Sequence, residues 1–234
     1  MKKILSILML VVLCFSMAAC NFSSVEYGYE LNESGDGYVV TTIDATKVIT
    51  KNIILEIPAE YNGLPVKQVG YTDTNMAAAL LPMDVGYGKI VFPDSVEIIG
   101  ISAFATNHIG SIEFGNGLVS IERSAFNSCA TLQKLELPSS LKKIGRTAFQ
   151  DCKALNQVNI PNGCENIGQQ AFAGCSSLTE IFIPASVTTI GANAFSDCTN
   201  LVIKCEATSK PSDWKSNWFG NVAEANIIWG ATAN

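Results

Sequence analysis

A short motif that returns four times at one spacing limits the fold more than any other feature of this chain. Phe126, Phe149, Phe172 and Phe195 follow one another at steps of 23 residues. Each phenylalanine is preceded by an alanine and is followed, three residues later, by a cysteine. A fixed period of this size is the sequence signature of a solenoid, because a single repeat cannot bury its own apolar side chains and must stack on its neighbours.

One copy of the repeat predicts where strands and turns lie. Residues 132–138 end in alternating apolar and polar side chains, as in a half-buried strand, and Pro138 ends that strand because proline lacks a backbone donor. Residues 141–145 supply a second apolar segment that ends in a glycine suited to a tight turn. Phe149 then enters the core from a short helical turn that Cys152 closes. The predicted fold class is α/β or mainly β: a right-handed superhelical solenoid of repeats with short strands and short helical turns.

The repeat has the form Leu-x-x-Ile-x-Ile-Pro-x-x-Val-x-x-Ile-Gly-x-x-Ala-Phe-x-x-Cys. This pattern resembles that of the BspA-like leucine-rich repeat proteins of bacterial surfaces, over roughly Ile53 to Cys205. The resemblance implies an exported, non-enzymatic solenoid. Members of the family are associated with adhesion and with binding of host or neighbouring-cell proteins, and the family offers no catalytic residues to transfer.

The repeat boundaries divide the chain into five expected parts. These are a signal peptide over 1–19, a lipidated cysteine and tether over 20–26, an N-terminal cap over 27–52, the repeats over 53–205 and a C-terminal cap over 206–234. The repeats are irregular at 71–88, where the Ala-Phe pair and the cysteine are missing and residues 76–81 suggest a short helix stopped by Pro82. We interpret this stretch as a drifted repeat with a loop insertion; the alternative is a loop that decorates a binding face.

The N-terminus predicts export and a membrane anchor. A basic start is followed by an apolar run over 4–17 that is too short to span a bilayer. The run ends in Met17-Ala18-Ala19-Cys20, which resembles the bacterial lipobox and makes Cys20 the expected lipidation site. A diacylated cysteine anchors a protein stably, since two acyl chains hold where one is marginal. The alternative is an ordinary signal peptide cleaved after Ala19.

Charge argues against a nucleic-acid partner. The chain carries 15 basic and 21 acidic residues, a net charge of −6, and removal of Lys2 and Lys3 with the signal peptide leaves 13 against 21, or −8. A surface that follows a phosphate backbone needs clustered Lys and Arg, and the sequence shows no such cluster. We therefore expect no nucleic-acid binding.

The sequence offers few residues suited to catalysis or metal binding, so we predict no cofactor, no metal and no enzyme activity. The one histidine, His108, belongs to no ligand pair, and the cysteines form no CxxC pair, which disfavours zinc. His108 is also the only base available for Ser/His/Asp chemistry and has no nucleophile motif nearby. Composition leaves a glycosidase-type carboxylate pair open, but the acidic residues fall at variable repeat positions, as solvated residues do.

Eight cysteines in an exported chain raise the question of disulfides. Cys14 leaves with the signal peptide and Cys20 is the lipid site, so six remain, four of them at one repeat position. Stacked equivalents run parallel and do not face each other as a disulfide requires. We predict buried, unpaired thiols that pack as small hydrophobes, Cys164 among them.

The candidate binding site is the outward face of the first strand of each repeat, because alternate side chains of a strand point away from the core. Glu113 and Glu136 are expected to be close neighbours, with repulsion that Lys89 or Lys134 could offset. We interpret the face as mixed in charge; the alternative is an acidic patch with Phe182 exposed at one end, suited to a basic or apolar partner. The candidate residues are Glu56, Lys89, Val91, Glu113, Lys134, Glu136, Gln157, Asn159, Glu180 and Phe182.

The resulting hypothesis is a membrane-anchored lipoprotein at the cell surface that binds another protein, from a host or from the envelope, and acts in adhesion or interaction. Two alternatives stay open: an envelope scaffold, and a module that captures glycans or peptides. The sequence does not identify the partner.

Overall fold

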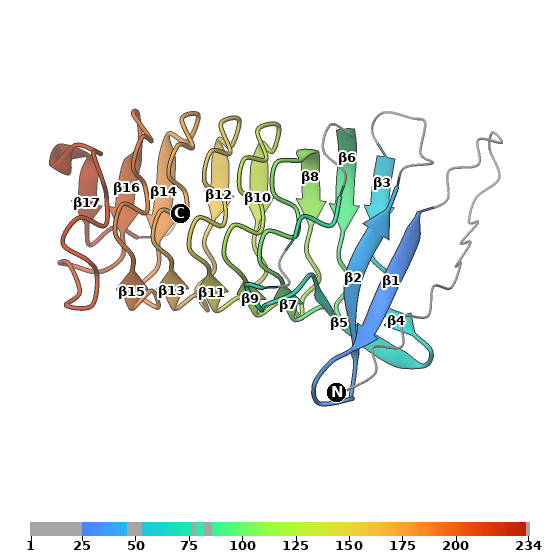
Figure 1. The fold of residues 1–234 in the computed structure, drawn as a ribbon. Helices are drawn as coiled ribbons and strands as arrows, with labels where there is room; N and C mark the ends of the chain where they lie inside the picture. The colour runs from blue at the N-terminus through green and yellow to red at the C-terminus, as the bar shows by residue number, and fades with distance from the viewer. Residues whose placement is uncertain (1–24, 46–52, 76–77, 82–85, 233–234) are drawn as a thin grey trace.

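The computed structural model describes residues 25–45, 53–75, 78–81 and 86–232. The expected signal peptide, Cys20 and most of the tether lie outside these residues, as do 46–52 of the expected N-terminal cap. The described chain winds into an elongated β-solenoid, with the N-terminal hairpin at one end and the C-terminal residues at the other (Figure 1). This confirms the repeat solenoid predicted from the 23-residue period.

Each turn of the solenoid, called a rung here, contributes one strand to the first of two rows, and each of the first six rungs also contributes one strand to the second row (Figure 1). The first row is β3 (Ile53–Glu56), β6 (Gly86–Val91), β8 (His108–Glu113), β10 (Lys134–Glu136), β12 (Gln157–Asn159), β14 (Glu180–Ile183), β16 (Val202–Cys205) and β17 (Ile227–Trp229). The second row is β5 (Leu64–Val69), β7 (Ile98–Ile99), β9 (Ser120–Ile121), β11 (Lys143–Ile144), β13 (Asn166–Ile167) and β15 (Thr189–Ile190). Neighbouring strands in both rows pair in parallel, because equivalent segments of successive rungs run in the same direction.

The two rows differ in continuity. The second row is one uninterrupted ladder from β5 to β15. The first row is divided into three sheets, β3-β6-β8, β10-β12 and β14-β16-β17. The break between β8 and β10 falls where the repeat shortens, since Phe104 and Phe126 are 22 residues apart and not 23.

The third side of each rung, called the turn side, lies between the second-row strand and the cysteine. In the rung of β11, Thr147 and Asp151 have positive φ angles of 53° and 58°. Residues of this side form single turns, such as the turn that includes Asp151 and is closed by a hydrogen bond from the Cys152 N–H to the Phe149 C=O at 3.4 Å. The expected short helical turns therefore take this form, and the one helix among the described residues is the 3₁₀ helix η1 (Glu224–Asn226).

Backbone hydrogen bonds on the second row and on the turn side point in opposite directions along the solenoid. The N–H groups of Lys142 and Gly145 donate to the preceding rung. The N–H groups of Thr147, Phe149 and Asp151 donate to the following rung. The N–H groups of Ala148 and Gln150, which lie between these donors, bond within their own rung, so every second residue of the turn side donates to the following rung.

A column of stacked phenylalanines forms the centre of the core. Phe126 and Phe149 are fully buried, with ring centroids 5.4 Å apart and ring planes 2° apart. The column runs through Phe104, Phe126, Phe149, Phe172 and Phe195, with centroid spacings of 5.4 to 5.8 Å. Such contacts add to the burial of the rings, so each rung is held by its two neighbours.

The prediction of buried, unpaired cysteines is confirmed for all six that the structure describes. In the four repeat cysteines, Sγ donates to the C=O of the phenylalanine in the preceding rung at 3.2 to 3.3 Å, as from Cys152 to Phe126. Asn107 takes this position one rung earlier. Its Nδ2 donates to the Ala105 C=O at 2.9 Å, while its buried Oδ1 has no hydrogen-bond partner within the described part of the chain.

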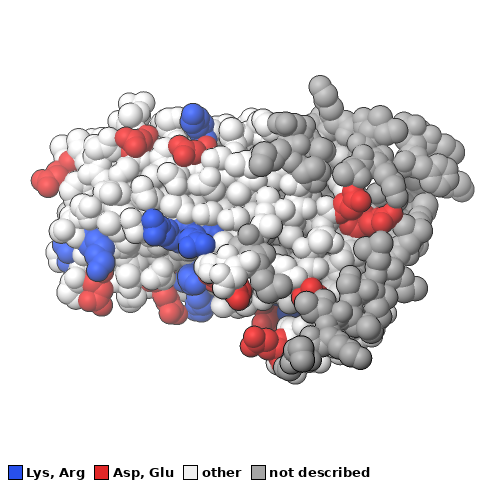
Figure 2. All heavy atoms as spheres, viewed as in Figure 1, with Lys and Arg blue, Asp and Glu red and all other residues white. Residues whose placement is uncertain are grey.

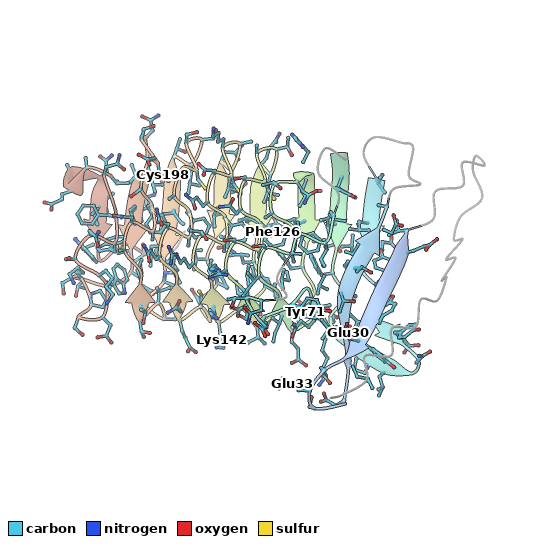
Figure 3. All side chains as sticks on the ribbon, in the orientation of Figure 1. Glu30, Glu33, Tyr71, Phe126, Lys142 and Cys198 are labelled. Atoms are coloured by element: carbon cyan, nitrogen blue, oxygen red, sulfur yellow. The ribbon has the colours of Figure 1, made fainter. Side chains whose placement is uncertain are left out.

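The N-terminal end is covered by an antiparallel hairpin of β1 (Glu26–Leu31) and β2 (Tyr38–Asp44). β2 extends the second row by pairing in parallel with β5, and β4 (Glu60–Tyr61) pairs with β5 in antiparallel. Tyr29 stacks on Tyr61 with centroids 4.0 Å apart. The hydroxyl of Tyr71 donates to Glu30 at 2.9 Å, and both side chains lie beside the hairpin in Figure 3.

The C-terminal end is covered by a tryptophan cluster. Trp218 packs edge-on against Phe195, with centroids 6.0 Å apart, and so continues the phenylalanine column. Trp214 packs against Trp218 and donates its Nε1–H to the Val187 C=O at 3.1 Å. Trp229 closes the cluster from β17.

The short helix suggested for residues 76–81 is not found in the part that can be described. Residues 78–81 contain no helix, and 76–77 lie outside the described residues. Leu80 and Leu81 are buried, and the Leu80 N–H donates to the Ala103 C=O at 2.8 Å. Packing onto a neighbouring rung has therefore overridden the local helix propensity of the alanine run.

Candidate functional site: the outward face of the first strand row

The outward side chains of the first strand row, called the strand face here, form two parallel columns. In each strand the residue between the two inward apolar side chains points outward, and so does the residue two positions earlier. In β10, for example, Lys134 and Glu136 are exposed on either side of the fully buried Leu135. The same pattern in β12 exposes Gln157 and Asn159 around Val158.

All ten candidate residues predicted from the sequence lie on this face. They come from β3 (Glu56), β6 (Lys89, Val91), β8 (Glu113), β10 (Lys134, Glu136), β12 (Gln157, Asn159) and β14 (Glu180, Phe182). Their registers align them into columns, for instance Glu56 beside Val91 and Val91 beside Glu113. Val91, Lys89 and Phe182 are half-buried and the other seven are exposed.

Ion pairs neutralise the acidic residues in the middle of the face. Lys89 pairs with Glu113, and Lys134 Nζ lies 2.6 Å from Glu136 Oε1. Glu180 pairs with Lys204 at 2.8 Å. The expected repulsion between Glu113 and Glu136 is therefore offset by both candidate lysines. Each of these three carboxylates has a cationic partner, which favours the mixed-charge interpretation over an acidic patch.

The face continues beyond the predicted residues at its C-terminal end. β16 pairs with β14 so that Val202 lies beside Glu180 and Lys204 beside Phe182. β17 then places Ile228 beside Lys204, and Ile228 is 45% exposed. Sequence reasoning missed these residues because their repeats lack the proline that marks the end of the earlier strands, although Val202-Ile203-Lys204-Cys205 keeps the alternation of the pattern.

A shallow depression of about 380 Å³ opens on the face between β8 and β10. Its rim is charged and its floor is apolar: Lys89, Ser111, Ile112, Glu113, Phe114, Lys134 and Glu136 line it. β8 and β10 are neighbours in the row but belong to different sheets, so no ladder of backbone hydrogen bonds closes the space between them. The depression therefore lies at one of the two breaks in the first row.

The described residues offer little for catalysis or metal binding. They contain no group of three His, Cys, Asp or Glu side chains that could hold a metal ion. His108 is exposed at the start of β8. Burial raises the pKa of Cys129 to about 12 and that of Cys164 to about 11, so these thiols stay protonated at neutral pH and are poor nucleophiles. Across the same residues, no helix has the length and apolar character needed to cross a bilayer.

Comparison with known families agrees with this architecture. Residues 85–202 match the BspA type leucine rich repeat region, in six copies, and this segment makes up half of the chain. The protein belongs to this family. No match was found among curated proteins.

Solved structures of similar shape are bacterial repeat proteins. The leucine rich repeat protein of T. pallidum is 29% identical, with a TM-score of 0.64, over 76% of this chain and 78% of its own. The pneumococcal vaccine antigen PcpA is 25% identical, with a TM-score of 0.61, over 78% of this chain. This chain spans only 48% of PcpA. A leucine rich cell surface protein from Faecalibacterium prausnitzii, 24% identical with a TM-score of 0.53, shares the fold.

Proposed function

We propose that this family member is a membrane-anchored surface lipoprotein that binds another protein through its strand face. The observation that carries the proposal is a row of outward side chains that the fold does not need. The core is complete behind them, yet the face extends over eight strands, from Glu56 to Ile228. Repeat solenoids use such extended surfaces for binding.

The depression between β8 and β10 is the centre of the proposed surface. Phe114 lies in its floor and two lysine–glutamate pairs lie at its rim. A buried apolar contact surrounded by polar groups is the usual anatomy of a protein interface. Surface ion pairs contribute only about 0–1 kcal/mol to stability, so these four side chains are free to exchange partners when another protein docks.

The proposed anchor rests on the Cys20 motif, and the proposed surface location is supported by similar proteins described as a vaccine antigen and as a cell surface protein. Replacing Cys20 by serine should abolish incorporation of labelled palmitate and move the protein out of the detergent phase in a phase-partition assay. Unchanged labelling in the Cys20→Ser variant would contradict the anchor.

A binding screen tests the partner. Wild-type protein is presented side by side to extracellular-matrix proteins, envelope extracts and a glycan array. Saturable binding to a host protein supports adhesion, binding confined to envelope extract supports the scaffold alternative, and binding confined to glycans supports the capture alternative. The apolar floor of the depression is the feature that favours capture, since it could accept one small apolar group.

Charge reversal then locates the face. Glu113→Lys/Glu136→Lys breaks both rim pairs, and we expect it to weaken partner binding at least tenfold while the far-UV circular dichroism stays unchanged. Glu60→Lys/Glu224→Lys is the matched control, because both residues are exposed and lie off the strand face. Equal binding by the strand-face variant and the control would rule the strand face out as the docking surface.

A further inference from the structure

The solenoid gathers four basic side chains on two neighbouring rungs, away from the strand face. Arg123 and Arg146 occupy the same repeat position, and the N–H of Ser124 donates to the Arg146 C=O at 2.9 Å. Lys142 and Lys143 begin the second of these rungs. In Figure 3 the Lys142 label lies at the edge of the array near β11, and Figure 2 shows Lys and Arg side chains gathered over this part of the molecule.

The two arginines have no partner of their own. Both are exposed, and neither forms an ion pair or a side-chain hydrogen bond within the residues that the structure describes. The lysines differ, because Lys143 lies 2.8 Å from Glu122 and Lys142 lies 3.5 Å from Glu165. Two guanidinium groups are therefore available beside two lysines that are both paired.

The backbone of each arginine lies against a glycine of the following rung. A Cβ at Gly145 would lie 2.7 Å from the backbone nitrogen of Arg123, and one at Gly168 would lie 2.5 Å from that of Arg146. These glycines let the backbones of neighbouring rungs approach closely at both arginines. The row is short, because the equivalent position is the buried Ile101 on one side and the uncharged Gln169 on the other.

The chain is acidic overall, so a group of basic side chains differs from the rest of its surface. Residues 21–113 contain four basic and 12 acidic residues, whereas 114–234 contain nine of each. An acidic partner would be repelled by the N-terminal half and drawn to the patch, so the distribution orients its approach.

We propose that Arg123, Arg146 and Lys142 form a docking surface for a short acidic peptide segment of a partner protein. A guanidinium binds a carboxylate with two parallel hydrogen bonds, and equivalent residues of adjacent rungs are about 4.8 Å apart. That spacing suits two carboxylates close together in one segment, such as neighbouring aspartates. The surface is separate from the strand face, so the two proposals stand or fall independently.

The test uses a fluorescein-labelled peptide of six aspartates flanked by glycine and serine, with the six-asparagine peptide as the neutral probe. Fluorescence anisotropy at low salt should show saturable binding of the aspartate peptide and no binding of the asparagine peptide. Arg123→Gln/Arg146→Gln should weaken it at least tenfold, and the dependence of affinity on salt should become shallower. The fold should be intact, because both side chains are exposed.

Lys153→Gln/Lys215→Gln is the matched control. It removes the same charge from two exposed lysines outside the patch, neither of which forms an ion pair among the described residues. We expect less than a twofold loss of affinity. An equal loss in both double variants, or no binding of the aspartate peptide by the wild-type protein, would overturn the proposal, because the first shows unspecific charge attraction and the second shows no site.

Discussion

The column of buried thiols makes stability depend on pH in a direction that the structure determines. Burial raises the pKa of Cys129 and of Cys198 to about 12, and it raises the pKa of Cys152 and of Cys175 well above the ordinary thiol range. The four thiols are thus protonated in the folded state up to high pH, while in the unfolded chain they ionise at a pKa of about 8.5. Folding then retains protons that the unfolded state has lost, so stability falls as pH rises above about 8.5 and continues to fall until the folded-state pKa is reached.

The size of the effect follows from the number of thiols. Burial also raises the pKa of Cys164 to about 11 and that of Cys205 to about 12, so six thiols contribute. Each one costs about 1.4 kcal/mol for every pH unit above the unfolded-state pKa, so the six together cost roughly 8 kcal/mol per unit. A domain with a free energy of unfolding of about 5–15 kcal/mol would lose a large part of it between pH 9 and pH 10. We therefore expect cooperative alkaline unfolding near pH 10.

This loss can be measured by unfolding the protein with guanidinium chloride at pH 7, 8, 9 and 10. A reductant is present, and unfolding is followed by far-UV circular dichroism. Cys152→Ser should lower stability at pH 7, but it should also reduce the slope of stability against pH by about one sixth, since one of the six buried thiols is gone. Stability at pH 10 within about 1 kcal/mol of the value at pH 7 would refute the reasoning, because it would mean that the thiols ionise alike in both states.

Three further measurements test the packing. Phe149→Ala should lower the free energy of unfolding by about 3–5 kcal/mol in a denaturant titration, because the ring is fully buried and stacked on both faces; a loss below about 1 kcal/mol would contradict the stacked column. Trp214→Phe keeps most of the apolar volume but removes the hydrogen bond to Val187, and the same titration should show a loss of about 1–2 kcal/mol, whereas a gain in stability would speak against that bond. Counting thiols on unreduced protein without residues 1–20 should give close to six only after denaturation, and none found would mean that the cysteines are oxidised.

The sequence predicted the repeated part of the fold well because periodicity is a direct consequence of stacking. Each Phe and Cys of the motif meets its own equivalents, so one copy of the repeat explains the others. The outward columns of the strand face followed from the same period combined with the alternation of strands.

Features formed by side chains of different rungs were harder to predict from the sequence. The sequence left open which of two lysines offsets the repulsion between Glu113 and Glu136, and the structure pairs Lys89 with Glu113. Nothing in the sequence indicated the depression beside this pair, which lies between strands of two different sheets. The basic patch escaped notice because Arg123 and Arg146 are 23 residues apart and form no run of basic residues in the chain. Local propensity also failed at residues 78–81, where contact with the Ala103 rung decided the conformation.

The opposed hydrogen bonds of the second row and the turn side have an electrostatic consequence for the length of the array. In an α-helix all peptide dipoles align, so the two ends acquire partial charges that must be satisfied by caps or ions. Here the peptide dipoles on one side of each rung oppose those on another side, as the N–H groups of Lys142 and Phe149 illustrate. Their fields therefore oppose each other within a rung, so an added rung raises the partial charge at the ends of the array less than an added turn does in an α-helix. Apolar covers such as the Trp214 cluster suit ends of this kind.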